Sequence, residues 1–173
     1  KKLSESLDLS LEESKELIAQ YHSRVPFVKG MQQALITRLN EQTTDEAYLR
    51  SLRGRRLTFD QWEPATFELT KAYTRAEAER EYGKVSLKRA YTYKSLNKLI
   101  QSSAADMTKQ AMVDVYKQGI VPLVQVHDEL CCSVKSKKEA FVIKKIMEDA
   151  IPLKIPSKCD VELGDRWGNT EEI

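Results

Sequence analysis

Residues 121–134, VPLVQVHDELCCSV, constrain the fold more than any other part of the sequence. Two runs rich in β-branched side chains flank a short polar segment, which is the pattern of a β-hairpin that turns at its polar residues. Because side chains alternate between the faces of a strand, Gln125 and His127 project from the same face. The pattern therefore predicts a rigid hairpin with His127 and Asp128 at its turn.

The segments around this hairpin predict an α+β fold. A helix from the N-cap Ser103 to Gln118 precedes it, and Gly119 ends that helix. A second helix begins after Ser136, and alternating apolar residues predict a strand over 159–163. This order of elements favours an antiparallel sheet, with the hairpin at its centre and helices covering one side.

The first hundred residues predict a separate, mostly helical lobe. The predicted elements are a helix over 10–23, a helix over 26–39, a basic hairpin over 49–59 that turns at Gly54, an irregular stretch over 62–72 and a long helix over 75–100. We place the domain boundary at 74/75, before the long helix, which we group with the second part of the chain. Residues 1–74 form a helical segment with the basic hairpin, and residues 75–173 contain the hairpin of 121–134.

Composition excludes several classes of protein. No apolar run approaches the ~20 residues needed to cross a bilayer, so we expect no membrane span. Three cysteines, two of them adjacent, form neither a disulfide framework nor a zinc-binding pattern, which favours a reducing compartment. The sequence begins without Met and without a signal peptide. We therefore expect a piece of a longer, cytoplasmic polypeptide.

The net charge of +2 hides two basic clusters. Their members are Arg50, Arg53, Arg55 and Arg56 in the first cluster, and Lys84, Lys88, Arg89, Lys94 and Lys98 in the second. Such clusters are typical of a nucleic-acid surface, but also of a solvated helix face, and the residues alone leave both open. Asn97 and Gln101 lie four apart, so both amides project from one face of the predicted helix.

Adjacent carboxylates, Asp128 and Glu129, at a hairpin tip suit a divalent metal ion. Mg²⁺ prefers oxygen ligands and is often bound by one or two carboxylates together with substrate phosphates. A two-metal phosphoryl-transfer site, however, needs carboxylates from at least two segments. Without further context, ordinary turn residues are the favoured interpretation of the pair.

The sequence resembles the family A DNA polymerases in four motifs, which follow the family's order and cover nearly the whole chain. They are L-R-G-R-R-L at 52–57, N-x-x-x-Q-S-S-A-A-D at 97–106, Q-V-H-D-E-L at 125–130 and G-D-R-W at 164–167. The helix pair over 10–39 resembles the stretch that follows the fingers of the family. The resemblance implies the palm sheet with its central hairpin, together with a lobe derived from the fingers.

The resemblance also implies a role for each matching residue. Asp128 is similar to the palm aspartate that ligates both catalytic Mg²⁺ ions, and Glu129 to the acid that assists it. His127 and Gln125 would lie near the primer terminus, and Asn97 and Gln101 would touch the duplex from its minor groove. Lys94 and Lys98 would add DNA contacts. Arg55 and Arg56 would either bind backbone phosphate or brace the lobe. Apart from the resemblance, we expect Asp106 to cap or brace its own helix.

The sequence departs from the family pattern at several positions. Ser102 and Ser103 replace the family's Gly-Thr, and Leu99-Ile100 replaces the stretch with its proline, as in a divergent, phage-borne member. The first palm motif and the nucleotide-gripping fingers helix have no match. The two Mg²⁺ ions would therefore be shared with an aspartate outside this chain, in the upstream remainder of the polymerase.

The expected function is thus that of the carboxy-terminal part of a DNA polymerase that binds primer-template DNA and dNTP. Its two-metal site would be incomplete without the upstream segment, so we expect the fragment alone to be inactive. Two alternatives remain. A relative of single-subunit RNA polymerases is disfavoured by Glu129. A non-catalytic, duplex-binding scaffold is disfavoured because both Asp128 and Glu129 are retained.

Overall fold

The computed structural model describes residues 2–66, 71–83 and 85–173. Lys84 and part of the segment predicted to be irregular lie outside the described residues. The chain divides into two compact units: a first unit of residues 1–50 and 56–99, and a second unit of residues 51–55 and 100–173. The predicted division at 74/75 concerns the parts of a polymerase and stays a prediction.

Three helices begin the first unit: α1 Lys2–Leu7, α2 Leu11–Arg24 and α3 Pro26–Asn40. The predicted capping box is present, because Ser10 Oγ accepts from Glu13 N at 3.2 Å and the Glu13 carboxylate accepts from Ser10 N at 2.9 Å. Pro26 occupies the first position of α3, where the missing N–H costs no helical hydrogen bond. These local signals placed both helices correctly.

The basic hairpin is also present, as antiparallel strands β1 Ala47–Arg50 and β2 Arg56–Phe59. Gly54 lies in its turn with φ +80°, a conformation that glycine adopts without steric cost. Alternate residues of both strands point inward, as the burial pattern shows. The resulting hydrophobic core consists of Leu39, Ala47, Leu49, Leu57 and Phe59, with Leu35 and Leu99 packed against it.

The predicted helix over 75–100 is wrong. Helix α4, Arg75–Tyr82, ends at Gly83, whose φ of +66° is left-handed. The chain then forms strand β5 Leu87–Arg89 and the 3₁₀ turn η1 Thr92–Lys94. The prediction failed because helix-favouring composition was outweighed by a helix-ending glycine and by strand pairing with a distant segment.

That distant segment is strand β3, Gln61–Pro64, which pairs with β5 on one side and with β4 Tyr73–Thr74 on the other. The stretch over 62–72 was predicted to be irregular. For Trp62 to Pro64, which lie in β3, this prediction is also wrong. The first unit therefore combines helices with small antiparallel sheets, instead of being mostly helical as predicted.

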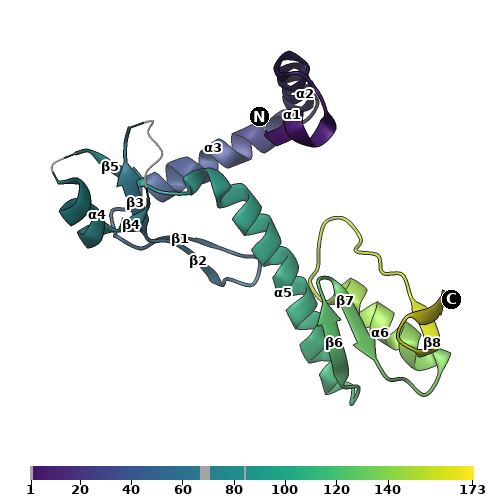
Figure 1. The fold of residues 1–173 in the computed structure, drawn as a ribbon. Coiled ribbons are helices and arrows are strands. Elements are labelled where there is room, and N and C mark those ends of the chain that lie inside the picture. The colour runs from purple at the N-terminus through teal and green to yellow at the C-terminus, as the bar shows by residue number, and fades with distance from the viewer. Residues whose placement is uncertain (1, 67–70, 84) are drawn as a thin grey trace. The chain divides into compact units, whose positions relative to one another are not determined.

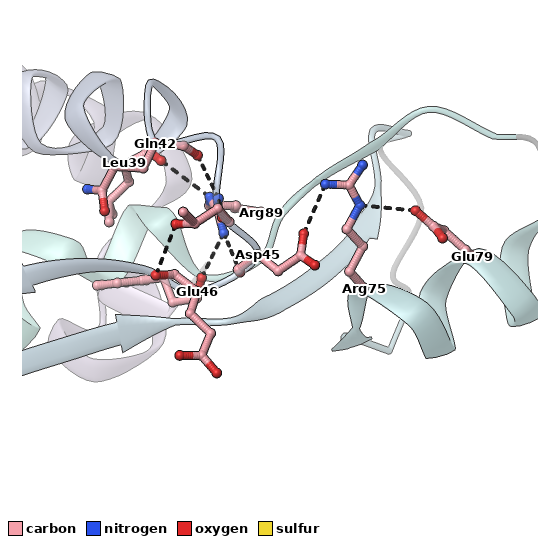
Figure 2. A network of polar contacts seen from close by, with 9 residues as sticks. Leu39, Gln42, Asp45, Glu46, Arg75, Glu79 and Arg89 are labelled. Carbon is pink, nitrogen blue, oxygen red and sulfur yellow. Dashed lines mark hydrogen bonds and ion pairs between the residues drawn. The ribbon is translucent and has the colours of Figure 1, made fainter.

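A single buried guanidinium, that of Arg89, holds this unit together (Figure 2). The side chain is 5% exposed, and each of its five N–H groups donates to a different backbone carbonyl. The acceptors are Leu39 O at 3.3 Å, Asp45 O at 2.8 Å, Phe59 O at 3.1 Å, Gln42 O at 2.8 Å and Thr44 O. Burial lowers the pKa of Arg89 from its ordinary value, and the ring of Trp62 lies 4.5 Å from the guanidinium carbon.

The second unit contains most of helix α5, Ser95–Lys117, followed by the predicted hairpin (Figure 1). Helix α5 runs through Ser103 without a break, so the N-cap predicted there is wrong. Instead, Ser103 Oγ accepts a hydrogen bond from Leu52 N at 3.2 Å. The side chain that favoured a helix start is therefore used to hold a segment distant in sequence.

The predicted hairpin forms as β6 Pro122–Val126 and β7 Glu129–Cys132. Helix α6, Lys137–Asp149, follows, with Ser136 as its N-cap. The last strands are β8 Glu162–Arg166 and β9 Asn169–Glu172, so the strand predicted over 159–163 begins three residues late.

The coarse α+β class is confirmed, since helices are combined with antiparallel strand pairs. In the described parts of the chain these strands form four separate sheets of two or three strands. Their assignment to palm and fingers stays a prediction. No described helix combines the length and the apolar character needed to cross a membrane.

We predict that Arg89→Met destabilises the chain strongly. The substitution removes five donors and leaves buried carbonyl groups without partners, at about 1–3 kcal/mol for each group that water does not reach. Arg89→Lys should recover only part of the loss, because an ammonium offers three donors. Urea unfolding followed by circular dichroism measures both variants.

The matched control is Arg75→Met. Arg75 is exposed and its ion pairs, with Asp45 at 3.0 Å and Glu79 at 3.0 Å, lie in solvent. This variant should lose much less stability than Arg89→Met, and equal losses would contradict the role assigned to Arg89.

Candidate functional site

The candidate catalytic residues lie at the tip of the β6–β7 hairpin. Val126 pairs with Glu129, so His127 and Asp128 form a two-residue turn. His127 adopts a left-handed φ of +50°, and the Gln125 side-chain amide donates to its carbonyl oxygen. The strand register and the Gln125 hydrogen bond fix the turn, while His127, Asp128 and Glu129 are all exposed. The structure brings together the four residues that the sequence predicted on this hairpin.

The tip offers carboxylate oxygens, the ligand type that Mg²⁺ prefers. Asp128 projects from the turn, and Glu129 is the first residue of β7. Among the residues that the structure describes, however, no three His, Cys, Asp or Glu side chains gather closely enough to hold a metal ion. The donor set therefore fits a hard cation only as one side of a site that needs further ligands.

The two candidate amides both lie on α5. Asn97 and Gln101 are exposed and one helical turn apart, as the sequence predicted. Two exposed amides one turn apart on a helix can donate hydrogen bonds to acceptors that repeat along a groove.

The lysines near these amides, Lys94 and Lys98, contact other residues of the first unit, to which both belong. Lys98 Nζ donates to Thr58 O at 2.7 Å and lies 4.6 Å from the centre of the Phe59 ring. Lys94 Nζ lies 4.7 Å from the ring of Tyr91 and 5.6 Å from that of Tyr93. Both ammonium groups are therefore held over aromatic rings while remaining exposed.

Arg55 and Arg56, adjacent in sequence, have different surroundings. The Arg56 guanidinium lies 4.7 Å from the centre of the Tyr48 ring, at the start of β2. Arg55 Nη2 instead forms an ion pair with Asp106 at 2.9 Å and donates to Ser102 O at 2.8 Å. Of the two roles left open by the sequence, bracing describes the contacts of Arg55.

Asp106 was not among the predicted site residues, although it is the most engaged carboxylate of the second unit. Its side chain is 6% exposed, and it accepts from Arg53 N at 3.3 Å as well as from Arg55. Burial alone would raise the pKa of Asp106, but hydrogen bonds from Ser51 and Arg53 and the charge of Arg55 lower it. The sequence did carry a signal for Asp106, since it is a charged residue on a helix face of otherwise small and apolar residues. Asp106 braces a turn rather than its own helix.

Comparisons with known proteins agree with the family that the sequence resembles. Residues 1–169 match the model of the family described as DNA polymerase family A. A DNA-directed DNA polymerase of Pseudomonas phage M6 is 34% identical over 158 residues, which are 91% of this chain and 20% of the phage protein. The thermostable DNA polymerase I of Thermus aquaticus is 29% identical over 178 residues, 99% of this chain and 19% of that protein.

A solved structure is similar as well. The POL domain of Pol1 from M. smegmatis, in complex with DNA primer-template and dNTP, has a TM-score of 0.63 and 26% sequence identity. The similarity covers 89% of this chain and 25% of that one. The chain spans about a fifth of the length of the curated relatives it matches. Because the family match covers nearly every residue, this chain belongs to DNA polymerase family A.

Proposed function

We propose that this chain is the carboxy-terminal part of a template-directed DNA polymerase that adds dNTPs to a primer 3′-OH by two-metal phosphoryl transfer. The observation that carries the proposal is an exposed aspartate, Asp128, on a rigid two-residue turn in a chain of this family. The similarity to a POL domain solved with primer-template and dNTP supports DNA and nucleotide as partners.

Asp128 would hold the metal ions, with Glu129 assisting. When bound, Mg²⁺ would offset the charge that develops on the phosphate oxygens during in-line attack. The chain itself contributes a fixed geometry: Gln125 ties down the carbonyl of His127, and the strand register sets the position of the neighbouring carboxylates. His127 would lie beside the primer terminus.

Asn97 and Gln101 would contact the nascent duplex from its minor groove. Purine N3 and pyrimidine O2 acceptors recur there in every base pair, so amide donors can test the shape of a pair without reading its sequence. Lys94, Lys98 and Arg56 would neutralise backbone phosphates, and we assign the bracing role to Arg55.

A further polymerase segment would complete the site. Each Mg²⁺ needs several oxygen ligands to offset its lost hydration, and the described residues gather no such set. Large apolar side chains also lie open to solvent, among them Phe27 at 64%, Ile155 at 76% and Trp167 at 72% exposure. These faces fit burial against more protein. The three cysteines are unpaired thiols, consistent with the cytoplasmic location that we propose.

Asp128→Asn should abolish nucleotide addition while leaving the fold and DNA affinity intact. The amide keeps the shape of the side chain but removes the charge that holds the metal, so turnover should fall by orders of magnitude. The measurement is single-turnover primer extension by the chain together with a polymerase segment that supplies the second aspartate. Asp149→Asn, an exposed carboxylate on α6, is the matched control and should extend normally. Extension by Asp128→Asn at the control rate would disprove the assignment.

Gln101→Ala should weaken binding to primer-template DNA by about 1–3 kcal/mol, the cost of leaving a polar group of the complex without a partner. It should also change extension from a mismatched end more than extension from a matched one. Fluorescence anisotropy with a labelled primer-template measures the affinity. Gln33→Ala, which removes an exposed amide from α3, is the control. If both variants bind and extend mismatches like the wild type, Gln101 makes no such contact.

The 173 residues alone should not extend a primer, because one hairpin cannot supply the ligands of two metal ions. Adding the complementary segment, covalently or as a second chain, should restore extension that depends on Mg²⁺ and on the template. Asp128→Asn serves as the control for contaminating polymerase. Extension by the chain alone, absent from that control, would mean that a complete site lies within these residues.

A further inference from the structure

The turn between β1 and β2, residues 51–55, is held by hydrogen bonds within itself. Gly54 N donates to Ser51 O at 2.9 Å, Ser51 N donates to Arg55 O at 3.0 Å, and Arg55 N donates to Ser51 Oγ at 3.2 Å. Ser51 is buried, at 6% exposure. The backbone of the turn is therefore fixed by its own contacts before any ligand is considered.

Side chains of helix α5 accept hydrogen bonds from the remaining amide groups of this turn. Leu52 N donates to Ser103 Oγ at 3.2 Å and Arg53 N donates to Asp106 Oδ2 at 3.3 Å. A glycine-containing turn with free N–H groups could bind a phosphate through its backbone. Here those groups point to protein acceptors, so any anion contact of this turn must come from its side chains.

The two exposed arginine side chains of the turn differ in how far they are engaged. Arg55 is tied to Asp106 Oδ1 at 2.9 Å and to Ser102 O at 2.8 Å. The Arg53 side chain forms no hydrogen bond or ion pair with any residue that the structure describes, although its backbone is anchored. A cation on an anchored backbone can meet a phosphate with little loss of backbone freedom.

The charge of Arg53 also acts on Asp114, a carboxylate that has hydrogen-bonding partners of its own. The pKa of Asp114 is lowered first by a hydrogen bond from Gln110 at 2.7 Å, then by Lys117, whose Nζ lies 3.0 Å away, and further by the charge of Arg53. Gln110 and Lys117 each donate to one oxygen of Asp114, and no ion pair joins Asp114 to Arg53 in the described part of the chain. The Arg53 guanidinium is therefore available to another anion.

We propose that Asp106 is a positioning residue that holds the turn 51–55 so that Arg53, and not Arg55, contacts a phosphate of the DNA. The inference rests on the proposed polymerase function, and it names a contact that the sequence motifs did not single out. The buried carboxylate orders the backbone of Arg53 and at the same time occupies Arg55. Although Asp106 is negatively charged, it would in this way strengthen binding to DNA, which is also negatively charged.

The salt dependence of DNA binding tests this division of roles. The logarithm of the affinity for duplex falls with the logarithm of salt concentration by about 0.9 for each phosphate neutralised. Arg53→Gln should make this slope shallower by about 0.9, the contribution of one phosphate contact. Arg55→Gln should leave the slope unchanged but should lower the thermal stability. Arg80→Gln, on α4, removes an exposed arginine elsewhere and should keep the wild-type slope.

The direction in which Asp106→Asn changes DNA binding distinguishes a positioning role of Asp106 from a simple effect of its charge. Removing a carboxylate raises the net charge and would by itself tighten DNA binding, as would the release of Arg55. The proposal expects the opposite, a slope reduced as in Arg53→Gln, with no further reduction in the double variant Arg53→Gln/Asp106→Asn. Asp149→Asn makes the same change of charge on α6 and should not lower the slope.

These measurements use the 173-residue chain, labelled primer-template duplex and fluorescence anisotropy, with thermal unfolding to check each fold. A wild-type slope in Arg53→Gln, a slope lowered equally by Arg80→Gln, or tighter binding by Asp106→Asn would each overturn the inference. If Asp106→Asn does not fold, the contrast between Arg53→Gln and Arg55→Gln decides alone. The proposed function has its own readout, extension that depends on Asp128, so either can fail without the other.

Discussion

The first unit depends on one buried cation that satisfies backbone carbonyls. Arg89 reaches the end of α3, the loop that follows it and the end of β2, and all five of its donors are used (Figure 2). Loop carbonyls turned away from water need donors, and a planar guanidinium supplies several in fixed directions. The small hydrophobic core around Leu39 and Phe59 can therefore form beside a loop that has no regular structure.

The second unit uses a buried charge of the opposite sign. Asp106 accepts from the amide of Arg53 and from the guanidinium of Arg55, so it fixes a turn as Arg89 fixes a loop. Both charges are bonded mainly to groups distant in sequence, and both lie beside elements with candidate roles in binding. A buried charge that is fully hydrogen-bonded holds such irregular segments in one conformation, whereas apolar contacts would allow several.

The candidate catalytic site is held by fewer contacts than the loop at Arg89 or the turn at Asp106. A two-residue turn between paired strands presents Asp128 to solvent, and the Gln125 amide secures the turn. The proposed function requires this exposure, because metal ions and the primer terminus would have to reach the carboxylate. In this family A chain, local contacts fix the turn, and the candidate catalytic side chains are exposed to solvent.

Local sequence determined the elements whose causes lie within a few residues. The Ser10 capping box, Pro26 at the start of α3, Gly54 in the basic hairpin and the polar tip of 127–128 each act through neighbours in the chain. Tertiary structure decided the rest. Arg89 lies 50 residues from Leu39, and Asp106 lies 53 from Arg53, so no periodicity or propensity could have paired them. The same holds for β5, a strand only because β3 lies beside it, and for Ser103, whose hydroxyl serves Leu52 instead of a helix end. A sequence window registers what a residue prefers, but a buried polar group is decided by which distant partner satisfies it.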